Sequence, residues 1–266
     1  MFGDDLAATS LRIIALDRPG IGLSNFQPGR TFADWATDIA ALADHLHWPR
    51  FGVLGNSGGG PYTAAVASLL PDRVTTAVVV SGAWRMDAPE VKANLPNINR
   101  IFWILARRFP PALGLLLHSM RQSDSKAISE APSEADVKRL ESMLPPQDVA
   151  ALLAPGRMAA TSVGVTEALR HGTKGAAWDA RMFVHPFGFD HTAIHSPSMP
   201  SMVRSTATSP SPSPSATSLK SPSRPSPSSP EDGHLSTPCN HLPEIVAAIK
   251  QLPSAPPAGP ANSSLR

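Results

Sequence analysis

Three short apolar runs mark the first third of the chain. They cover residues 11–16, 51–54 and 76–81, and each is nearly continuous rather than alternating, which is typical of parallel strands buried on both faces. Between the first two runs, apolar side chains recur at helical spacing after Thr31, a residue suited to cap a helix; they are Phe32, Trp35, Ile39, Leu42 and Leu46. Residues 64–70 predict a second helix. Strands and helices that alternate at such short intervals predict a parallel, right-handed α/β sheet.

The pattern becomes helical between about residue 85 and residue 168. The predicted helices are 101–106 and 112–117, which Pro110 and Pro111 separate, and the shorter segments 134–143 and 148–153. A helical insertion directly after a strand of the sheet predicts a cap over the site. An ordinary helical layer is the alternative. Residues 169–195 would then bring the chain back to the sheet.

Serine and proline dominate residues 196–230, and they alternate strictly from Ser209 to Ser215. Such a composition cannot bury a core, so it predicts a disordered segment. Recognisable patterning resumes over 231–252, which includes a short amphipathic helix, and residues 253–266 are predicted to be a disordered tail. The domain organisation expected from these changes is an N-terminal part of an α/β core (1–84), the helical cap (85–168), a return to the core (169–195), the Ser/Pro-rich segment (196–230) and a C-terminal core segment (231–252).

Composition narrows the possible partners and the compartment. The net charge is +2 and the basic residues are scattered, which favours no polyanionic partner, so we expect neither nucleic acid nor a membrane surface to bind. The single cysteine, Cys239, excludes an internal disulfide and fits a reducing compartment. No apolar run reaches membrane-spanning length and the start has no signal-peptide pattern. We therefore expect a cytoplasmic protein; the oligomeric state stays open.

The segment from Gly55 to Gly59 carries the strongest chemical signal. It reads Gly-Asn-Ser-Gly-Gly between an apolar strand and a helix, which is the G-x-S-x-G nucleophile elbow in the setting that the motif requires. The pattern predicts that Ser57 is held above the end of the sheet and that glycines flank it because the turn leaves no room for a Cβ. The N–H of Gly58 is then placed to stabilise an oxyanion. The alternative is a loop that only turns a corner.

His234 is the histidine expected to act as the base. It follows Asp232 and Gly233 on a turn, from which a histidine can reach a serine that is distant in sequence. Taken by itself, however, a histidine on such a loop is more often a solvated surface residue. His185, His191 and His195 have no metal-ligand spacing, so we expect them at the surface.

The remaining candidates are weaker. Asp190 and Asp232 are acids that could in principle orient the histidine, but we assign neither. Asp17 and Arg18 follow the first apolar run and are expected to brace their loop. Trp84 and Trp103 are expected to line an apolar substrate pocket, with core packing as the equal alternative. We expect no metal and no cofactor.

Four stretches together resemble the α/β-hydrolase superfamily. They are Asp17–Ser24, the elbow at Gly55–Pro61, the segment Pro71-Asp-Arg-Val74, and Glu231–Ser236. The closest likeness is to the proline-iminopeptidase-like and epoxide-hydrolase-like branch with a helical cap, over residues 5–195 and 231–252. The resemblance implies an α/β-hydrolase fold and a serine, an acid and a histidine in that chain order. Ser57 and His234 match the first and the last.

Two parts of that family pattern have no counterpart in the sequence. One is a strand with a His-Gly loop, expected before the run 11–16, which supplies the second oxyanion donor; losing one such donor costs about 10²–10³ in rate in a well-studied serine protease. The other is the acid loop with its strands, whose place residues 196–230 occupy. Read one nucleotide earlier, with permissible codons, 197–214 allows a strand and a His-Gly-Glu-x-Asp pattern. We favour an out-of-frame translation over a true linker.

The sequence as a whole predicts a serine hydrolase that acts on a small ester, amide or related substrate through an acyl-enzyme on Ser57. Because the acid and one oxyanion donor have no counterpart, we expect turnover to be impaired. The alternative is a catalytically inactive remnant of the fold or a binding protein. A third possibility, a module whose Ser/Pro segment recruits partners, has no supporting PxxP cluster with basic flanks.

Overall fold

The computed structural model describes residues 9, 11–83, 86, 88, 97–124, 132–190, 204–205 and 233–250, without the side chains of 97–99, 120–124 and 204–205. Within these ranges the centre of the fold is a parallel sheet in the order β1 (Phe51–Asn56), β2 (Val74–Val80), β3 (Arg204–Ser205). Strand β2 pairs with β1 from Val74 to Val80 and with β3 at Val79 and Val80. The predicted parallel α/β sheet is confirmed.

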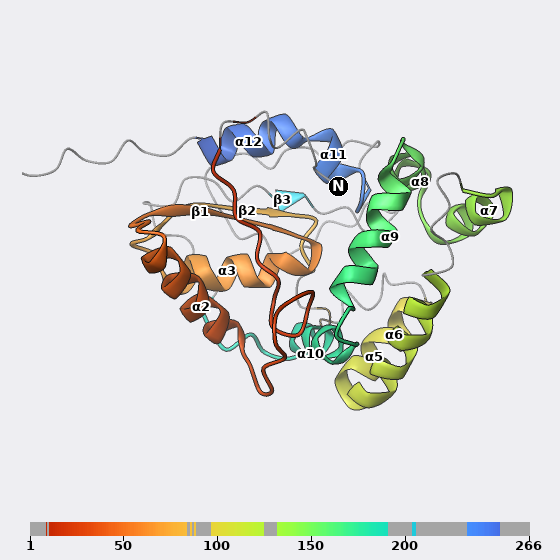
Figure 1. Cartoon of the computed structure of the whole chain (residues 1–266), viewed down its shortest axis with the longest axis horizontal. Coiled ribbons are helices and arrows are strands. Elements are labelled where there is room, and N and C mark those ends of the chain that lie inside the picture. Colours follow the sequence, from red (N-terminus) through yellow and green to blue (C-terminus); the bar gives the residue numbers. More distant parts are fainter. Residues whose placement is uncertain are drawn as a thin grey trace, which may run out of the picture.

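Helices cover both faces of this sheet (Figure 1). Helix α3 (Gly60–Leu69) contacts β1 and β2 from one side, and helix α12 (Leu242–Lys250) contacts β2 from the other. All seven residues of β2 are therefore buried, and on the α12 face Val78 and Val80 pack against Ile245 and Ala248. Burying a valine stabilises the fold by about 1.5–3 kcal/mol, which is why valines at 74 and 78–80 suit this central strand.

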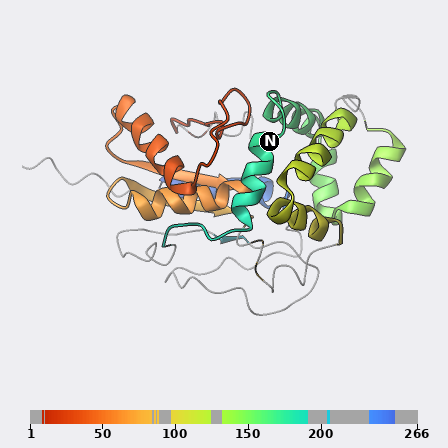
Figure 2. The same ribbon diagram turned by 90° about the horizontal axis from the view of Figure 1, so that it is seen from below.

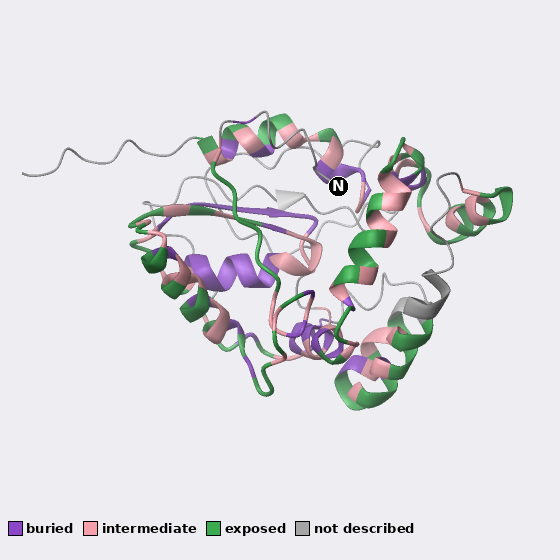
Figure 3. Cartoon of the chain, in the orientation of Figure 1, coloured by how far each residue is buried: buried purple, intermediate pink, exposed green. Residues whose placement is uncertain are grey.

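Helix α2 (Phe32–His45) begins where the sequence predicted. The Thr31 hydroxyl accepts the Asp34 N–H, and the Asp34 carboxylate accepts the Thr31 N–H, which forms a capping box. The helix buries Phe32, Ala36 and Ala43 and packs against α3. Figure 3 shows the contrast between these two helices, since α3 is almost entirely buried and α2 exposes its outer face.

The prediction of a buried strand over residues 11–16 is wrong. No strand is assigned there among the described residues, and Ile13, Ile14 and Leu16 are 49%, 38% and 39% exposed. A strand is stable only where its N–H and C=O groups pair with a neighbour. The described sheet runs β1-β2-β3 and gives residues 11–16 no place in a ladder.

Six helices lie between β2 and β3. They are α5 (Asn97–Arg108), α6 (Pro110–Asp124), α7 (Glu134–Met143), α8 (Pro146–Leu153), α9 (Arg157–Ala168) and α10 (Lys174–Phe183), among the described residues. Their positions confirm the predicted helical region with its break at the two prolines. Figures 1 and 2 show α5 to α9 grouped beyond the carboxyl ends of the strands, and α10 packs against α5 and α6. Their role as a cap over the site remains a prediction.

The Ser/Pro-rich segment 196–230 differs from the expectation at one point. Arg204 and Ser205 form strand β3, paired in parallel with β2, where disorder was predicted. The rest of that segment and the tail 253–266 lie outside the described residues. The out-of-frame origin of the segment remains a prediction. The amphipathic helix predicted at 242–252 is confirmed from Leu242 to Lys250 as α12, while residues 251 and 252 lie outside the described ones. The short helix α11 (Thr237–Asn240) precedes it.

Membrane-spanning length is not reached by any single helix of the described ranges. Only α8 and α9 taken together have the length and the apolar composition, and they are bent by 90° at their junction.

Candidate active site

Ser57 lies at the carboxyl end of β1 in a strained turn. Its φ angle is 51°, in the left-handed region that residues other than glycine rarely adopt. Strain of this kind costs about 1–3 kcal/mol and persists only where the surrounding structure enforces it. The turn leads through a single 3₁₀ turn, η1 (Ser57–Gly59), directly into α3. The structure therefore has the strand–turn–helix geometry that presents a serine side chain at the edge of a sheet.

The two outer glycines of the elbow have different roles. A Cβ on Gly55 would overlap the Gly59 carbonyl and the Thr63 side chain, so no larger residue fits there. A Cβ on Gly59 would meet no atom within 4 Å. The steric explanation for both glycines is therefore correct for Gly55 and wrong for Gly59.

His234 contacts Ser57 directly. The His234 Nε2 atom lies 2.9 Å from the Ser57 Oγ atom, across 177 positions of sequence. This is a normal hydrogen-bond distance, and a neutral imidazole with its proton on Nδ1 accepts the hydroxyl proton at Nε2. The contact has the geometry of a nucleophile and its general base.

The N–H of Gly58 lies at the first turn of η1. The first N–H groups of a helix have no acceptor within the helix, and Gly60 is the first residue of this turn whose N–H bonds back, to the Ser57 carbonyl. The Ala83 N–H donates to that carbonyl too, at 2.9 Å, and so ties the elbow to the end of β2. The Gly58 N–H thus belongs to the first turn after Ser57, and its role as an oxyanion donor remains a prediction.

Asp148 holds the loop that carries His234. This carboxylate, from helix α8, is only 1% exposed and accepts the backbone N–H groups of His234, Leu235 and Ser236, each at 2.9 Å. The Ser236 hydroxyl donates to it as well, at 3.1 Å. A Cβ on Gly233 would overlap the same carboxylate. Helix α8 thereby fixes the backbone of the His234 loop, which lies 86 positions after Asp148 in the sequence.

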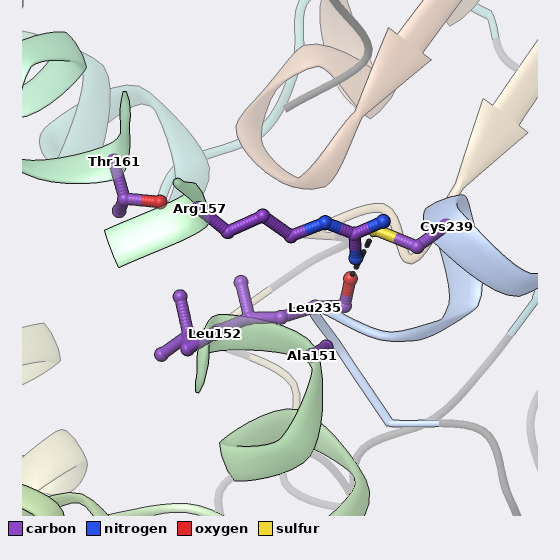
Figure 4. A pocket seen from close by; sticks show the side chains of 6 residues that line it. All are labelled: Ala151, Leu152, Arg157, Thr161, Leu235 and Cys239. Atoms are coloured by element: carbon purple, nitrogen blue, oxygen red, sulfur yellow. Dashed lines mark hydrogen bonds between the residues drawn. The ribbon is translucent and has the colours of Figure 1, made fainter. Parts of the chain in front are cut away.

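Figure 4 shows the space beside this loop. Helices α8 and α9 and the His234 loop enclose a small pocket there; its lining residues are Ala151, Leu152, Arg157, Thr161, Leu235 and Cys239. The Cys239 thiol donates to the Leu235 carbonyl across it, at 3.5 Å. The loop is therefore held by both its N–H and its C=O groups.

The Nδ1 atom of His234 has no hydrogen-bond partner among the described residues, because Asp148 bonds to the backbone of the loop and not to the ring. Asp190, on a short segment after α10, uses its carbonyl to accept the Ser68 hydroxyl, and Asp232 lies outside the described residues. The segment in which the acid of the family is expected, 196–230, lies outside them too, except for β3.

The other predicted residues fall in different places. Trp103 packs against Phe102 and Phe183, and Phe183 in turn lies 3.3 Å from where a Cβ on Gly58 would be. Trp103 is thus one side chain away from the elbow, while Trp84 lies outside the described residues. His185 is partly buried rather than at the surface; His191 and His195 lie outside the described ranges.

A buried charge cluster that the sequence reading missed lies behind the elbow. The Arg30 guanidinium bonds to the Asp179 carboxylate and to the Tyr62 hydroxyl, and Asp179 also accepts the Tyr62 hydroxyl and Arg18 Nε. Burial lowers the pKa of Arg30, but Asp179 and Tyr62 outweigh it and the pKa is raised. Burial, together with the Asp179 charge, raises the pKa of Tyr62. The cluster therefore contains two cations, one anion and a neutral phenol.

A family model described as the alpha/beta hydrolase fold matches residues 2–145, more than half of the 266 residues. The chain belongs to the alpha/beta hydrolase fold family. The expected superfamily is thereby confirmed; the proline-iminopeptidase-like and epoxide-hydrolase-like branch remains a prediction.

Two curated proteins and two solved structures are similar to the chain. A serine hydrolase-like protein of Danio rerio is 32% identical over 72 residues, and one of Dictyostelium discoideum is 30% identical over 93 residues; these spans are 26% and 33% of this chain. The matches cover only 22% and 26% of the relatives' own lengths. An alpha/beta hydrolase fold protein from Nakamurella multipartita is 26% identical, with a TM-score of 0.38 over 67% of this chain and 60% of that one. The epoxide hydrolase CorEH is 21% identical, with a TM-score of 0.33 over 59% and 57%.

The environment of His234 in this hydrolase fold predicts a pH dependence. Burial lowers the pKa of His234 below its ordinary value of 6.5, although the Asp148 charge partly offsets this by favouring the protonated ring. A histidine that acts as a base must be neutral, which holds at pH values above its pKa. The rate at which a fluorophosphonate labels Ser57 should therefore rise with pH through an inflection below 6.5 and be level at pH 7–8. An inflection above 7 would contradict the buried, neutral histidine.

Proposed function

We propose that this chain is a serine hydrolase that acts on a small ester, amide or related substrate through an acyl-enzyme on Ser57. The observation that carries the proposal is the 2.9 Å contact between Ser57 Oγ and His234 Nε2, made at an elbow whose serine has a left-handed φ angle. The names of the two curated relatives, both serine hydrolase-like proteins, support the same class.

The described residues account for the covalent steps. The Ser57 Oγ atom attacks the substrate carbonyl while His234 Nε2 takes its proton, and the oxyanion faces the Gly58 N–H. Collapse of this intermediate breaks the bond to the alcohol or amine, which leaves with the proton from His234. Water then attacks the acyl-enzyme, again with His234 as the base, and restores the serine.

Turnover in this proposal is slow. Nothing among the described residues bonds to His234 Nδ1, so this part of the chain supplies no partner that would fix the tautomer of the ring and stabilise its protonated form. Disrupting that partner by an Asp→Asn change lowers kcat about 10⁴-fold in a well-studied serine protease. We therefore expect acylation of Ser57 to be observed more readily than repeated hydrolysis.

The absence of a described partner for His234 Nδ1 also favours a second candidate function. This is a catalytically inactive member of the fold that binds a ligand without converting it. The two candidates differ in one property, the reactivity of Ser57. An inactive binding protein has no need for a hydroxyl that reacts with electrophiles, whereas a slow hydrolase must still form the covalent intermediate.

Covalent labelling tests the proposal without requiring turnover. The folded full-length chain is treated with a fluorophosphonate, and the adduct is located by mass spectrometry of the peptides. We expect the label on Ser57 and on no other serine of α3 or the elbow. Ser68→Ala, which changes a serine of the same helix that bonds to the Asp190 carbonyl, should label like the parent chain. A folded chain in which Ser57 remains unlabelled would favour the binding protein.

A further inference from the structure

Arg18 is held in one orientation beside the elbow. Its Nε atom donates to the Asp179 carboxylate at 2.8 Å, and its guanidinium lies over the Tyr62 ring, 5.1 Å from the ring centre. The anchoring Asp179 is itself fixed by Arg30 and Tyr62. Arg18 was expected only to brace its loop, but its neighbour Asp17 does that, by accepting the Leu23 N–H and the Ser24 hydroxyl.

The other end of the Arg18 guanidinium faces the site. Its Nη2 atom lies 4.0 Å from where a Cβ on Gly58 would be, and Gly58 is the residue whose N–H receives the oxyanion. The side chain is 30% exposed. Its Nη1 and Nη2 groups make no hydrogen bond within the described part of the chain, since Nε alone is bonded. The structure thus presents four N–H donors of a fixed guanidinium next to the nucleophile.

The net charge around Arg18 also favours an anionic group of a ligand. Arg18 and Arg30 carry two positive charges and Asp179 one negative charge, which leaves one positive charge at the cluster. The Asp17 carboxylate is solvent-exposed and bonded to Leu23, so water screens it. The N-terminal end of η1 and α3, also at Ser57, attracts negative charge as well. An anionic group of a ligand is therefore stabilised here.

We propose that Arg18 binds a carboxylate of the substrate, so that the site favours esters whose acyl chain ends in a carboxylate over their neutral counterparts. A planar guanidinium whose two Nη groups bond to no described residue matches a carboxylate in geometry. This inference rests on the proposed function, since it assigns the substrate class of the same Ser57 site. Arg18 recognises the far end of the acyl chain, and Ser57 reacts at the carbonyl.

Two matched probes test the assignment. Both are alkyl fluorophosphonates with a six-carbon chain, one ending in a carboxylate and the other in its methyl ester, and the rate of Ser57 labelling is measured for each. We expect the parent chain to react roughly 10- to 100-fold faster with the carboxylate probe, the range typical of hydrogen bonds to charged groups. Arg18→Gln should abolish this preference, and Arg18→Lys should retain part of it because the charge remains.

Arg12→Gln is the matched control, because Arg12 belongs to the same segment but is exposed and lies over Trp48. It should leave both labelling rates unchanged. If Arg18→Gln does not fold, as judged by circular dichroism and thermal unfolding, the salt dependence of the parent chain replaces it, and the preference should fall as ionic strength rises.

The outcomes separate this inference from the proposed function. Equal rates with the two probes on a Ser57 that labels normally would overturn the role of Arg18 and leave the hydrolase proposal intact. Failure of both probes to label Ser57 in the folded chain would overturn the hydrolase proposal itself. If Arg18→Gln slowed both probes by the same factor, Arg18 would act on the oxyanion or on the elbow, and the substrate assignment would be wrong.

Discussion

Replacing His234 with alanine is expected to slow the labelling of Ser57 by a fluorophosphonate about 10²–10⁴-fold, the usual contribution of a general base. The reason is the 2.9 Å contact between His234 Nε2 and Ser57 Oγ, without which the hydroxyl must lose its proton to water. Ser57→Ala should remove labelling at the elbow and any ester hydrolysis above background. Rates are measured by mass spectrometry of the Ser57 peptide over time.

Non-additivity provides the control for this pair. Residues that act as one unit in catalysis lose nearly all activity when either is changed. For ester hydrolysis, the double variant Ser57→Ala/His234→Ala should therefore be no slower than Ser57→Ala alone. A histidine variant that labels at the parent rate would mean that the contact has no catalytic role.

Replacing Asp148 with alanine is expected to release the loop that positions His234. Three backbone N–H groups would lose a buried acceptor, and each group left unsatisfied costs about 1–3 kcal/mol. We expect a lower Tm and slower labelling of Ser57, both measured on the full chain.

Asp148→Asn is the more selective change. The Asp148 Oδ1 atom accepts the Leu235 and Ser236 N–H groups, and the Oδ2 atom accepts the His234 N–H. An asparagine that keeps Oδ1 places an amide donor opposite the His234 N–H, so the bond to the histidine backbone is lost while the others remain. Labelling should fall with a smaller change in Tm than in Asp148→Ala. Removing the charge should also lower the pKa of His234 further, because the Asp148 charge raises it.

Asp136→Asn is the matched control for this change, because Asp136 occupies the same third position of helix α7 but is only half-buried and, in the described part of the chain, hydrogen-bonds to Ser133 alone. It should leave labelling unchanged. Gly233→Ala should act in the same direction as Asp148→Ala, since its Cβ would overlap the Asp148 carboxylate, and its effect should shrink in the Asp148→Ala background. Equal labelling of the Asp148 and Asp136 variants would show that the loop does not depend on Asp148.

Local patterns in the sequence were sufficient for the elements whose cause is local. The run of valines predicted strand β2, Thr31 predicted the start of α2, and the glycine-flanked serine predicted the elbow, because a buried strand, a helix cap and a tight turn each depend on a few adjacent residues. The same reasoning failed for residues 11–16. An apolar run forms a strand only if a partner strand pairs with it, and that partner is not a property of the run.

The features of the candidate site also divide into those that the sequence indicated and those that only the tertiary structure decided. The sequence by itself indicated Ser57 as the candidate nucleophile through its motif, and His234 as the candidate base through a resemblance. Only the tertiary structure decided that these two side chains lie within hydrogen-bond distance of each other. Asp148 is the clearest case, since its sequence context is an acid in the first turn of a short helix, a position that favours acids in any helix. Its contact with the His234 loop joins residues 86 positions apart, and no local signal encodes it.

The buried charge cluster also depends on contacts between residues that are distant in sequence. Its members are Arg18, Arg30, Tyr62 and Asp179. In the sequence they are a loop arginine, a residue before a helix cap, a residue after the elbow and a polar residue within an amphipathic helix. Burying a charge is unfavourable unless it is paired, so a sequence gives no reason to expect Arg30 to be 3% exposed until Asp179 is brought beside it. Pairing across 149 positions is decided by how helix α10 packs against the rest of the fold. That packing places the Nη groups of Arg18, which bond to no described residue, beside Gly58 of the elbow.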